Sequence, residues 1–257
     1  MNINDISTQL LYTTVPIITL TQQGATKSGT GFIFSIQEKD NRSIPLLVTN
    51  YHVLDGAIGG FFELHEAKDG KPSDKTIRVQ FDRTIINNNK LGELDAIAIP
   101  LAGTLLDLQN KGIQIFFRTV DQNMIPNKDV ENDLAALENV VFIGYPNSIY
   151  DTTNKIPVIR KGITATPIWN DFQGRKEFLI DAGVFPGSSG SPVFIFNQGA
   201  YPTRDGLAVG NRLLFIGMVS GAMLKNGQNH NDYLDLGIVI NSSALFEKIN
   251  EFVEKLK

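Results

Sequence analysis

The sequence predicts an all-β protein of two barrels followed by one C-terminal helix, and two features of the chain point to this class. Short apolar runs rich in Val, Ile and Phe recur along its 257 residues, each bounded by turn-forming residues, among them 23 glycines. The final stretch instead repeats its apolar residues with helical spacing. No repeat of fixed period is visible, which excludes solenoid and propeller folds.

The predicted strands fall into two groups along the chain. Residues 1–115 form the first barrel after a short N-terminal extension, with strands expected at 15–20, 31–36, 45–49, 77–81 and 96–101. Residues 139–241 form the second barrel, with strands expected at 140–145, 178–181, 192–196, 213–220 and 237–240. The polar residues 116–138 connect the two barrels, and a short helical turn is expected at 134–138.

Residues 242–257 are expected to form the C-terminal helix. Its apolar side chains fall on one stripe: Leu245, Ile249, Phe252, Val253 and Leu256. Ser242 or Ser243 is the expected N-cap, because a serine hydroxyl can accept a hydrogen bond from a free N–H of the first turn.

Composition excludes several classes of protein. The net charge of −4 argues against nucleic-acid binding, and no apolar run reaches the roughly 18 residues of a membrane-spanning helix. The chain has no cysteine, so disulfides, thiolate nucleophiles and cysteine-ligated metals are ruled out. The first 20 residues contain no Lys or Arg, so they are not expected to act as a secretory signal, although a removed signal peptide would not be visible in this sequence. We therefore expect a soluble cytoplasmic protein that needs no metal or cofactor and does not associate with membranes.

Candidate catalytic residues follow from the three histidines. His65 lies in a polar stretch and His230 in a polar loop, so both are expected to be structural or surface residues. His52 ends an apolar strand, and it is followed by Asp95, 43 residues later, and Ser189, 94 residues after that. A serine hydroxyl needs an adjacent base to become a nucleophile, so this set is suited to nucleophilic catalysis.

Several segments, taken in this order, resemble the chymotrypsin/trypsin-like serine peptidases, most closely their HtrA-like branch. They read GTGF at 29–32, LVTNYHVL at 47–54, LDAIAI at 94–99, DAGVFPGSSGSP at 181–192 and GMVS at 217–220. FIGYP at 142–146 and GITA at 162–165 resemble the start of the family's second barrel. The resemblance implies two antiparallel Greek-key β-barrels, and a catalytic site between them.

The resemblance also implies a role for each residue. His52 would act as general base and then general acid, Asp95 would hold its imidazole, and Ser189 would attack the substrate carbonyl. The backbone N–H groups of Gly187 and Ser189 would form the oxyanion hole. In trypsin-type zymogens the residue before the nucleophile is an Asp that pairs with a newly cleaved N-terminus. Ser188 stands there in this chain, so activation by that ion pair is not expected.

Three alternatives were weighed against this assignment. The order His, Asp, Ser differs from the orders found in subtilisins and α/β-hydrolases, and the loop lacks the second glycine of a Gly-x-Ser-x-Gly elbow. Asp181 competes with Asp95 for the carboxylate role. A shift of the loop by one position would make Ser188 the nucleophile, and Ser191 is a further neighbour; the Gly-x-Ser-Gly-x-Pro register favours Ser189.

The specificity pocket can be placed only by the resemblance. Gly183 occupies the pocket base, six residues before the nucleophile, where no acid is present to bind Arg or Lys. A small or medium apolar P1 side chain is therefore expected, unless Asp181 enters the pocket. The expected substrate-binding residues are Gly183, Val184, Phe185, Pro186, Ser220, Gly221, Ala222 and Gly237.

The sequence thus predicts a serine endopeptidase that hydrolyses proteins or peptides through an acyl-enzyme. The alternative is a catalytically silent or gated module that binds peptides or acts as an effector in a larger assembly with a regulatory partner protein. An intact His52, Asp95 and Ser189 set favours the enzyme. HtrA-like proteins usually carry PDZ domains after the peptidase; this sequence ends with the predicted helix, so their quality-control role and trimeric assembly are not expected.

Overall fold

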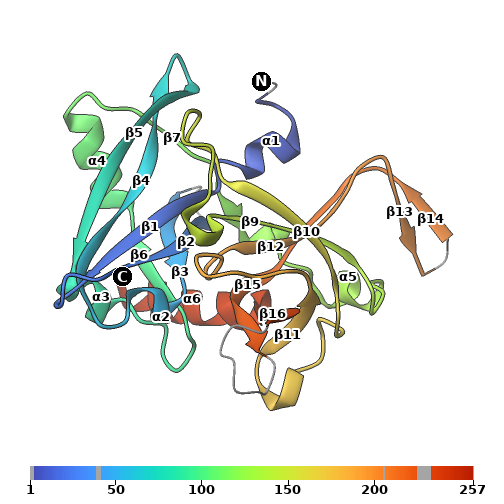
Figure 1. Cartoon of the computed structure of the whole chain (residues 1–257). Coiled ribbons are helices and arrows are strands. Elements are labelled where there is room, and N and C mark those ends of the chain that lie inside the picture. The colour runs from blue at the N-terminus through green and yellow to red at the C-terminus, as the bar shows by residue number, and fades with distance from the viewer. Residues whose placement is uncertain (1–2, 39–41, 205, 225–232, 257) are drawn as a thin grey trace.

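Two largely antiparallel sheets lie side by side in the computed structural model, and a C-terminal helix packs against the second of them (Figure 1). The structure describes residues 3–38, 42–204, 206–224 and 233–256. None of the helices in these ranges is long and apolar enough to span a membrane.

The first sheet is built from the N-terminal half of the chain. Its main path runs in the order β5-β4-β1-β2-β3-β6, with β7 paired to β4 and β8 to β2. The strands are β1 (Thr14–Thr21), β2 (Thr26–Gln37), β3 (Ser43–Thr49), β4 (Ala57–Lys68), β5 (Lys71–Asp82), β6 (Ile97–Pro100), β7 (Ile115–Phe116) and β8 (Val120–Asp121).

The second sheet closes on itself as a barrel in the order β10-β11-β16-β15-β12-β9. Its strands are β9 (Asn139–Gly144), β10 (Val158–Thr164), β11 (Glu177–Asp181), β12 (Pro192–Asn197), β15 (Arg212–Leu224) and β16 (Tyr233–Asn241). A separate hairpin of β13 (Ala200–Thr203) and β14 (Gly206–Val209) projects from the barrel (Figure 1).

Short helices connect the strands. The α-helices are α1 (Ile6–Leu10), α2 (Tyr51–Leu54), α3 (Arg83–Asn88), α4 (Ala102–Asn110), α5 (Lys128–Asn132) and α6 (Ser242–Leu256). The 3-10 turns are η1 (Gln122–Met124), η2 (Pro146–Ser148) and η3 (Phe172–Gly174).

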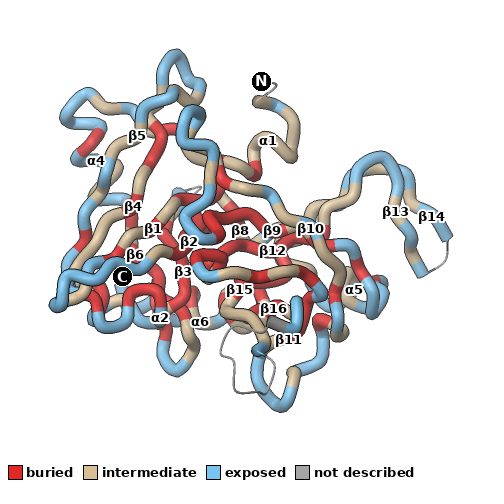
Figure 2. Tube along the Cα trace, in the orientation of Figure 1, coloured by how far each residue is buried: buried red, intermediate tan, exposed pale blue. Residues whose placement is uncertain are grey.

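Strand β2 is buried on both faces, and this places it between the two halves of the molecule. Ile33 points into the core of the first sheet, whereas Phe32 and Phe34 point into a cluster shared with β12, β15 and α6. Phe215 of β15 packs against both phenylalanines in that cluster. Figure 2 shows the buried segments gathered at this junction, while the β13–β14 hairpin is largely exposed or half-buried. The two sheets therefore share this cluster, and each sheet also has a buried cluster of its own.

Helix α6 confirms the predicted C-terminal helix, with two differences in detail. Ile249 is fully buried in the shared core, but Leu256 is 53% exposed and does not continue the apolar stripe. The N-cap is neither serine: Asn241 Oδ1 accepts a hydrogen bond from Ser243 N at 2.8 Å, and Ser242 is already helical.

The helical turn predicted at 134–138 is wrong. The helix of this region is α5, which begins earlier because Asn127 caps it by accepting a bond from Val130 N at 2.9 Å. Residues 134–138 are held instead by Thr164, which accepts from Glu138 N and donates to Ala136 O. Strand β4, strand β10 and helix α4 were not among the predicted elements, and β4 carries two glycines near its start.

Candidate active site

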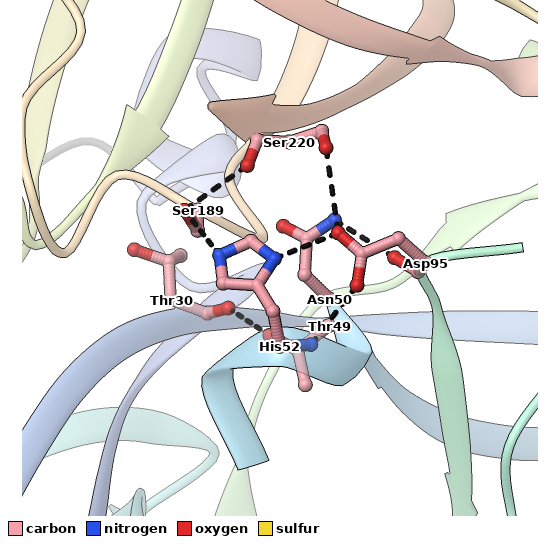
Figure 3. A network of polar contacts seen from close by, with 7 residues as sticks. All are labelled: Thr30, Thr49, Asn50, His52, Asp95, Ser189 and Ser220. Carbon is pink, nitrogen blue, oxygen red and sulfur yellow. Dashed lines mark hydrogen bonds and ion pairs between the residues drawn. The ribbon is translucent and has the colours of Figure 1, made fainter. Parts of the chain in front are cut away.

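Three side chains that lie far apart in the sequence meet between the two sheets (Figure 3). His52 Nδ1 lies 2.7 Å from Asp95 Oδ2, and His52 Nε2 lies 3.0 Å from Ser189 Oγ. The two contacts form one continuous line from carboxylate to imidazole to hydroxyl. The structure thus brings together the residues that the sequence singled out.

The elements around the site explain this geometry. His52 is on α2, directly after β3; Asp95 directly precedes β6, the neighbour of β3. Asp95 Oδ1 accepts a second bond from the backbone N of His52 at 2.9 Å. Because two bonds join Asp95 to one residue, both the position and the rotation of the imidazole are fixed.

Two further polar groups support Asp95. The buried side chain of Asn50 donates to Asp95 O at 2.9 Å, which ties the segment before β6 to the start of α2. The Ser220 hydroxyl on β15 donates to Asp95 Oδ2 at 3.4 Å, so the second barrel also contacts the carboxylate. Neither residue was assigned this role from the sequence, because both bonds join segments that lie far apart along the chain.

The competing residues lie elsewhere. Asp181 ends β11 with an exposed side chain, and it is Asp95 that meets His52. His65 bonds to Ser73 O and Lys155 O and packs edge-on against Tyr12, which makes it structural. His230 lies outside the described residues.

Ser189 is the serine of its loop that faces the imidazole. Ser188 and Ser191 are 2% and 1% exposed and lie away from His52, whereas the Ser189 hydroxyl is within reach both of His52 and of Ser220 O at 3.3 Å. The His52 side chain is 48% exposed, so the site is open to solvent and an extended peptide can reach Ser189.

The loop before Ser189 presents two backbone N–H groups. Gly187 has a φ of +89°, and a Cβ there would come 2.5 Å from Tyr145 O, so only glycine fits. Neither Gly187 N nor Ser189 N bonds an acceptor in the described part of the chain. Two such free donors beside a nucleophile are suited to stabilising an oxyanion.

Several of the residues expected to bind the substrate side chain lie close to one another, and an unpredicted arginine lies beside Gly183. A Cβ on Gly183 would come 3.0 Å from Arg160 Nη2, and the Arg160 guanidinium lies over the Phe185 ring at 5.2 Å. A Cβ on Gly237 would come 2.7 Å from Val184, so this wall is tightly packed. Pro186 is exposed, while Ser220, Gly221 and Ala222 are half-buried on β15.

Other groups in the structure give no sign of a second chemistry. Burial raises the pKa of the Tyr145 hydroxyl well above its usual value, so the group stays neutral and donates to Thr14 O at 3.4 Å. Within the described ranges, no cluster of three or more His, Asp or Glu side chains is arranged to hold a metal ion.

The chain was compared with known proteins. Residues 29–200 match the family model described as trypsin-like peptidase domain. Among solved structures, the active form of the Rv3671c protease from M. tuberculosis is 16% identical with a TM-score of 0.50, covering 97% of this chain and 84% of that one. The HL collagenase structure is 11% identical with a TM-score of 0.53, covering 95% of this chain and 94% of that one.

At these identities the two structures establish a shared fold, and no curated protein matches the chain. The family match is different in kind, because it spans well over half of the residues and includes all three side chains of the site. The chain therefore belongs to the trypsin-like peptidase family and is a serine endopeptidase.

Proposed function

We propose that the chain cleaves peptide bonds through His52, Asp95 and Ser189 by way of an acyl-enzyme. The observation that carries this proposal is the unbroken line of contacts, 2.7 Å from Asp95 to His52 and 3.0 Å from His52 to Ser189. Family membership supports the reaction class, and the contacts support the assignment of the residues.

The geometry supports the following steps. Ser189 Oγ attacks the carbonyl carbon while its proton passes to His52 Nε2, and the C–O bond forms as the carbonyl π electrons move to oxygen. The N–H groups of Gly187 and Ser189 stabilise that oxyanion. When the tetrahedral intermediate collapses, the C–N bond breaks and His52 protonates the leaving amine. Water then attacks the carbonyl carbon of the acyl–Ser189 ester while His52 accepts its proton. When the second tetrahedral intermediate collapses, His52 returns the proton to Ser189 Oγ and a free acid is released.

Asp95 acts through His52 in this scheme. Its Oδ2 accepts the Nδ1–H, which leaves Nε2 unprotonated and facing Ser189, and it stabilises the imidazolium formed after proton transfer. The second bond, to His52 N, keeps the carboxylate in place while this charge develops.

For the substrate side chain we retain small or medium apolar P1 residues as the first candidate. Gly183 offers no acid, and Val184 fills the space against Gly237, which limits the size of the side chain that can enter. The Arg160 guanidinium beside Gly183 further disfavours Arg or Lys at P1, because like charges repel.

The same arginine favours a second candidate, an acidic P1 residue. Arg160 has no ion-pair partner among the described residues, and a carboxylate at P1 would supply one. A library of peptides that differ only at P1 separates the candidates: preferred cleavage after Ala, Val or Leu supports the first, and after Glu or Asp the second. Preferred cleavage after Arg or Lys would overturn both.

Arg160→Met in the same library tests the role of the arginine, with Lys161→Met as its matched control, because Lys161 is an exposed neighbour on the same strand. If P1 is acidic, Arg160→Met should reduce cleavage after Glu at least tenfold and Lys161→Met should not. If P1 is apolar, apolar residues should stay preferred in both variants, and Arg160→Met should change only the discrimination against Arg or Lys.

The catalytic assignment is tested by labelling with a fluorophosphonate, which reacts with activated serines. Wild-type protein should be labelled, and both Ser189→Ala and His52→Ala should abolish labelling. Ser243→Ala, an exposed serine on α6, is the control and should label like wild type. Absence of labelling in folded wild-type protein would contradict the proposal and favour a silent or gated module that binds peptides.

A further inference from the structure

The loop that carries the oxyanion donors lacks the ion pair that orders it in trypsin-type enzymes, since Ser188 occupies the position of the acid. The structure contains two other bonds to this loop. Pro186 O accepts a hydrogen bond from Asn147 N at 2.6 Å, and Gly187 O accepts one from Thr30 Oγ1 at 2.8 Å. Each bond fixes one of the two peptide groups that flank Gly187.

The bond to Pro186 sets the direction of the first donor. A trans peptide carries its C=O and N–H on opposite sides, and no cis peptide is present in the described chain. Because the Pro186 carbonyl is held toward Asn147, the N–H of Gly187 must point the other way. Rotation of this peptide by half a turn would place a carbonyl where the donor belongs.

The turn that supplies the Asn147 N–H has an unusual backbone. Asn147 and Ser148 have φ values of +49° and +58°, in the left-handed region that side chains other than Asn and Asp rarely adopt. Such a conformation persists only where surrounding contacts hold it. One of those contacts is Thr30, whose Oγ1 accepts a bond from Tyr145 N at 3.0 Å.

Thr30 thus connects the loop that carries the oxyanion donors to the turn at residues 145–148. Its hydroxyl is fully buried, donates to the oxyanion loop at Gly187 O and accepts from the turn at Tyr145 N. Its backbone N also donates to Ser189 O at 2.9 Å. Figure 3 shows Thr30 close to the site, with its carbonyl bonded to Thr49.

We propose that Thr30 is a positioning residue for the oxyanion hole: its hydroxyl holds the Gly187 carbonyl and the 145–148 turn so that the Gly187 N–H stays directed at the reacting carbonyl. This rests on the proposed catalysis by Ser189. Thr30 and the turn perform the ordering that an ion pair with a new N-terminus performs elsewhere, so the hole is formed without cleavage of the chain.

Thr30→Val tests this proposal, because valine keeps the shape of the threonine side chain and lacks its hydroxyl. Loss of the hydroxyl should lower kcat about 10- to 100-fold with KM changed by less than threefold, because the oxyanion forms only in the transition state. A peptide aldehyde, which forms a tetrahedral adduct with serine, should lose affinity by the same factor. Thr30→Ser restores the hydroxyl and should recover both values to within threefold of wild type.

The chain offers a matched control in Thr164. Its buried hydroxyl makes the same pair of bonds in the second barrel, donating to Ala136 O at 2.7 Å and accepting from Glu138 N at 2.8 Å, and it touches no residue of the site. Thr164→Val should lower the Tm by an amount similar to Thr30→Val, with kcat and aldehyde affinity unchanged.

Each outcome is decisive. Folded Thr30→Val with wild-type kcat and aldehyde affinity would overturn the proposal, and so would equal losses in Thr164→Val. If Thr30→Val does not fold, Thr30→Ala takes its place in the comparison with Thr30→Ser. If Thr30→Val and Thr30→Ala both fail to fold while Thr164→Val folds, Thr30 is only structural. Failure of the underlying catalysis is distinguishable, because wild-type Ser189 would then resist the fluorophosphonate.

Discussion

At the scale of single residues, the site depends on one carboxylate that makes two bonds to one histidine. Asp95 binds both the imidazole and the backbone N of His52, and Asn50 anchors the backbone of Asp95 in turn. An amide in place of the carboxylate would keep the shape and at least one bond. It would, however, present an NH₂ donor to Nδ1 in one orientation and favour the wrong imidazole tautomer.

Asp95→Asn should therefore fold like wild type and lose about 10⁴-fold in kcat. Circular dichroism and thermal melting establish the fold, and peptide hydrolysis gives kcat. Asp181→Asn, on the competing carboxylate, should hydrolyse peptide at the wild-type rate. Near-normal turnover in Asp95→Asn would remove this residue from the catalytic set.

At the scale of elements, helix α6 stabilises the junction of the two sheets. It packs against β15 and β16, and its buried face enters the same cluster as Phe32 and Phe34 of β2. The helix contributes no group to the site, so its effect on activity is indirect: it fixes the position of β15, which carries Ser220.

Ile249→Ala should lower the free energy of unfolding by about 2–5 kcal/mol, because Ile249 is fully buried and truncation leaves a cavity. Leu256→Ala, on the exposed end of the helix, should change it by no more than about 0.5 kcal/mol. Urea unfolding monitored by fluorescence measures both. Similar values for the two variants would contradict the docking of α6 on the core.

At the scale of the whole molecule, the nucleophile loop is clamped by backbone contacts between the halves. Thr30 N donates to Ser189 O, and a Cβ on Gly190 would come 1.8 Å from Thr30 O. The loop and β2 therefore approach as closely as backbone permits, and Gly190 is the position that allows this.

Gly190→Ala should separate β2 from the loop, with a loss of several kcal/mol in stability and of fluorophosphonate labelling. Gly199→Ala is the matched control. The φ of Gly199, +83°, resembles the +90° of Gly190, but a Cβ added at Gly199 would meet no atom within 4 Å. This variant should cost only about 1–2 kcal/mol of backbone strain and keep full labelling. Equal losses of stability and labelling in the two variants would refute a close backbone contact between β2 and the nucleophile loop.

Most of what could be predicted from the sequence depends on residues close together along the chain. Contacts between segments that lie far apart along the chain could not be predicted. The C-terminal helix and the strands with continuous apolar runs follow from local pattern, whereas β4 and β10 were missed. The trio His52, Asp95 and Ser189 follows from motif order. Thr30 was quoted within its motif but received no role, because its partners at Gly187 and Tyr145 lie 157 and 115 residues away. Arg160 was missed for the same reason: its place beside Gly183 arises only when β10 folds against the loop.

The clamp between β2 and the nucleophile loop also bears on synthesis of the chain. A ribosome makes the N-terminal half first, so β2 with Thr30 is complete before Gly187 and Ser189 emerge. The nascent polypeptide thus carries His52 and Asp95 before it carries Ser189. The polypeptide holds no complete catalytic set until Ser189 has been synthesised.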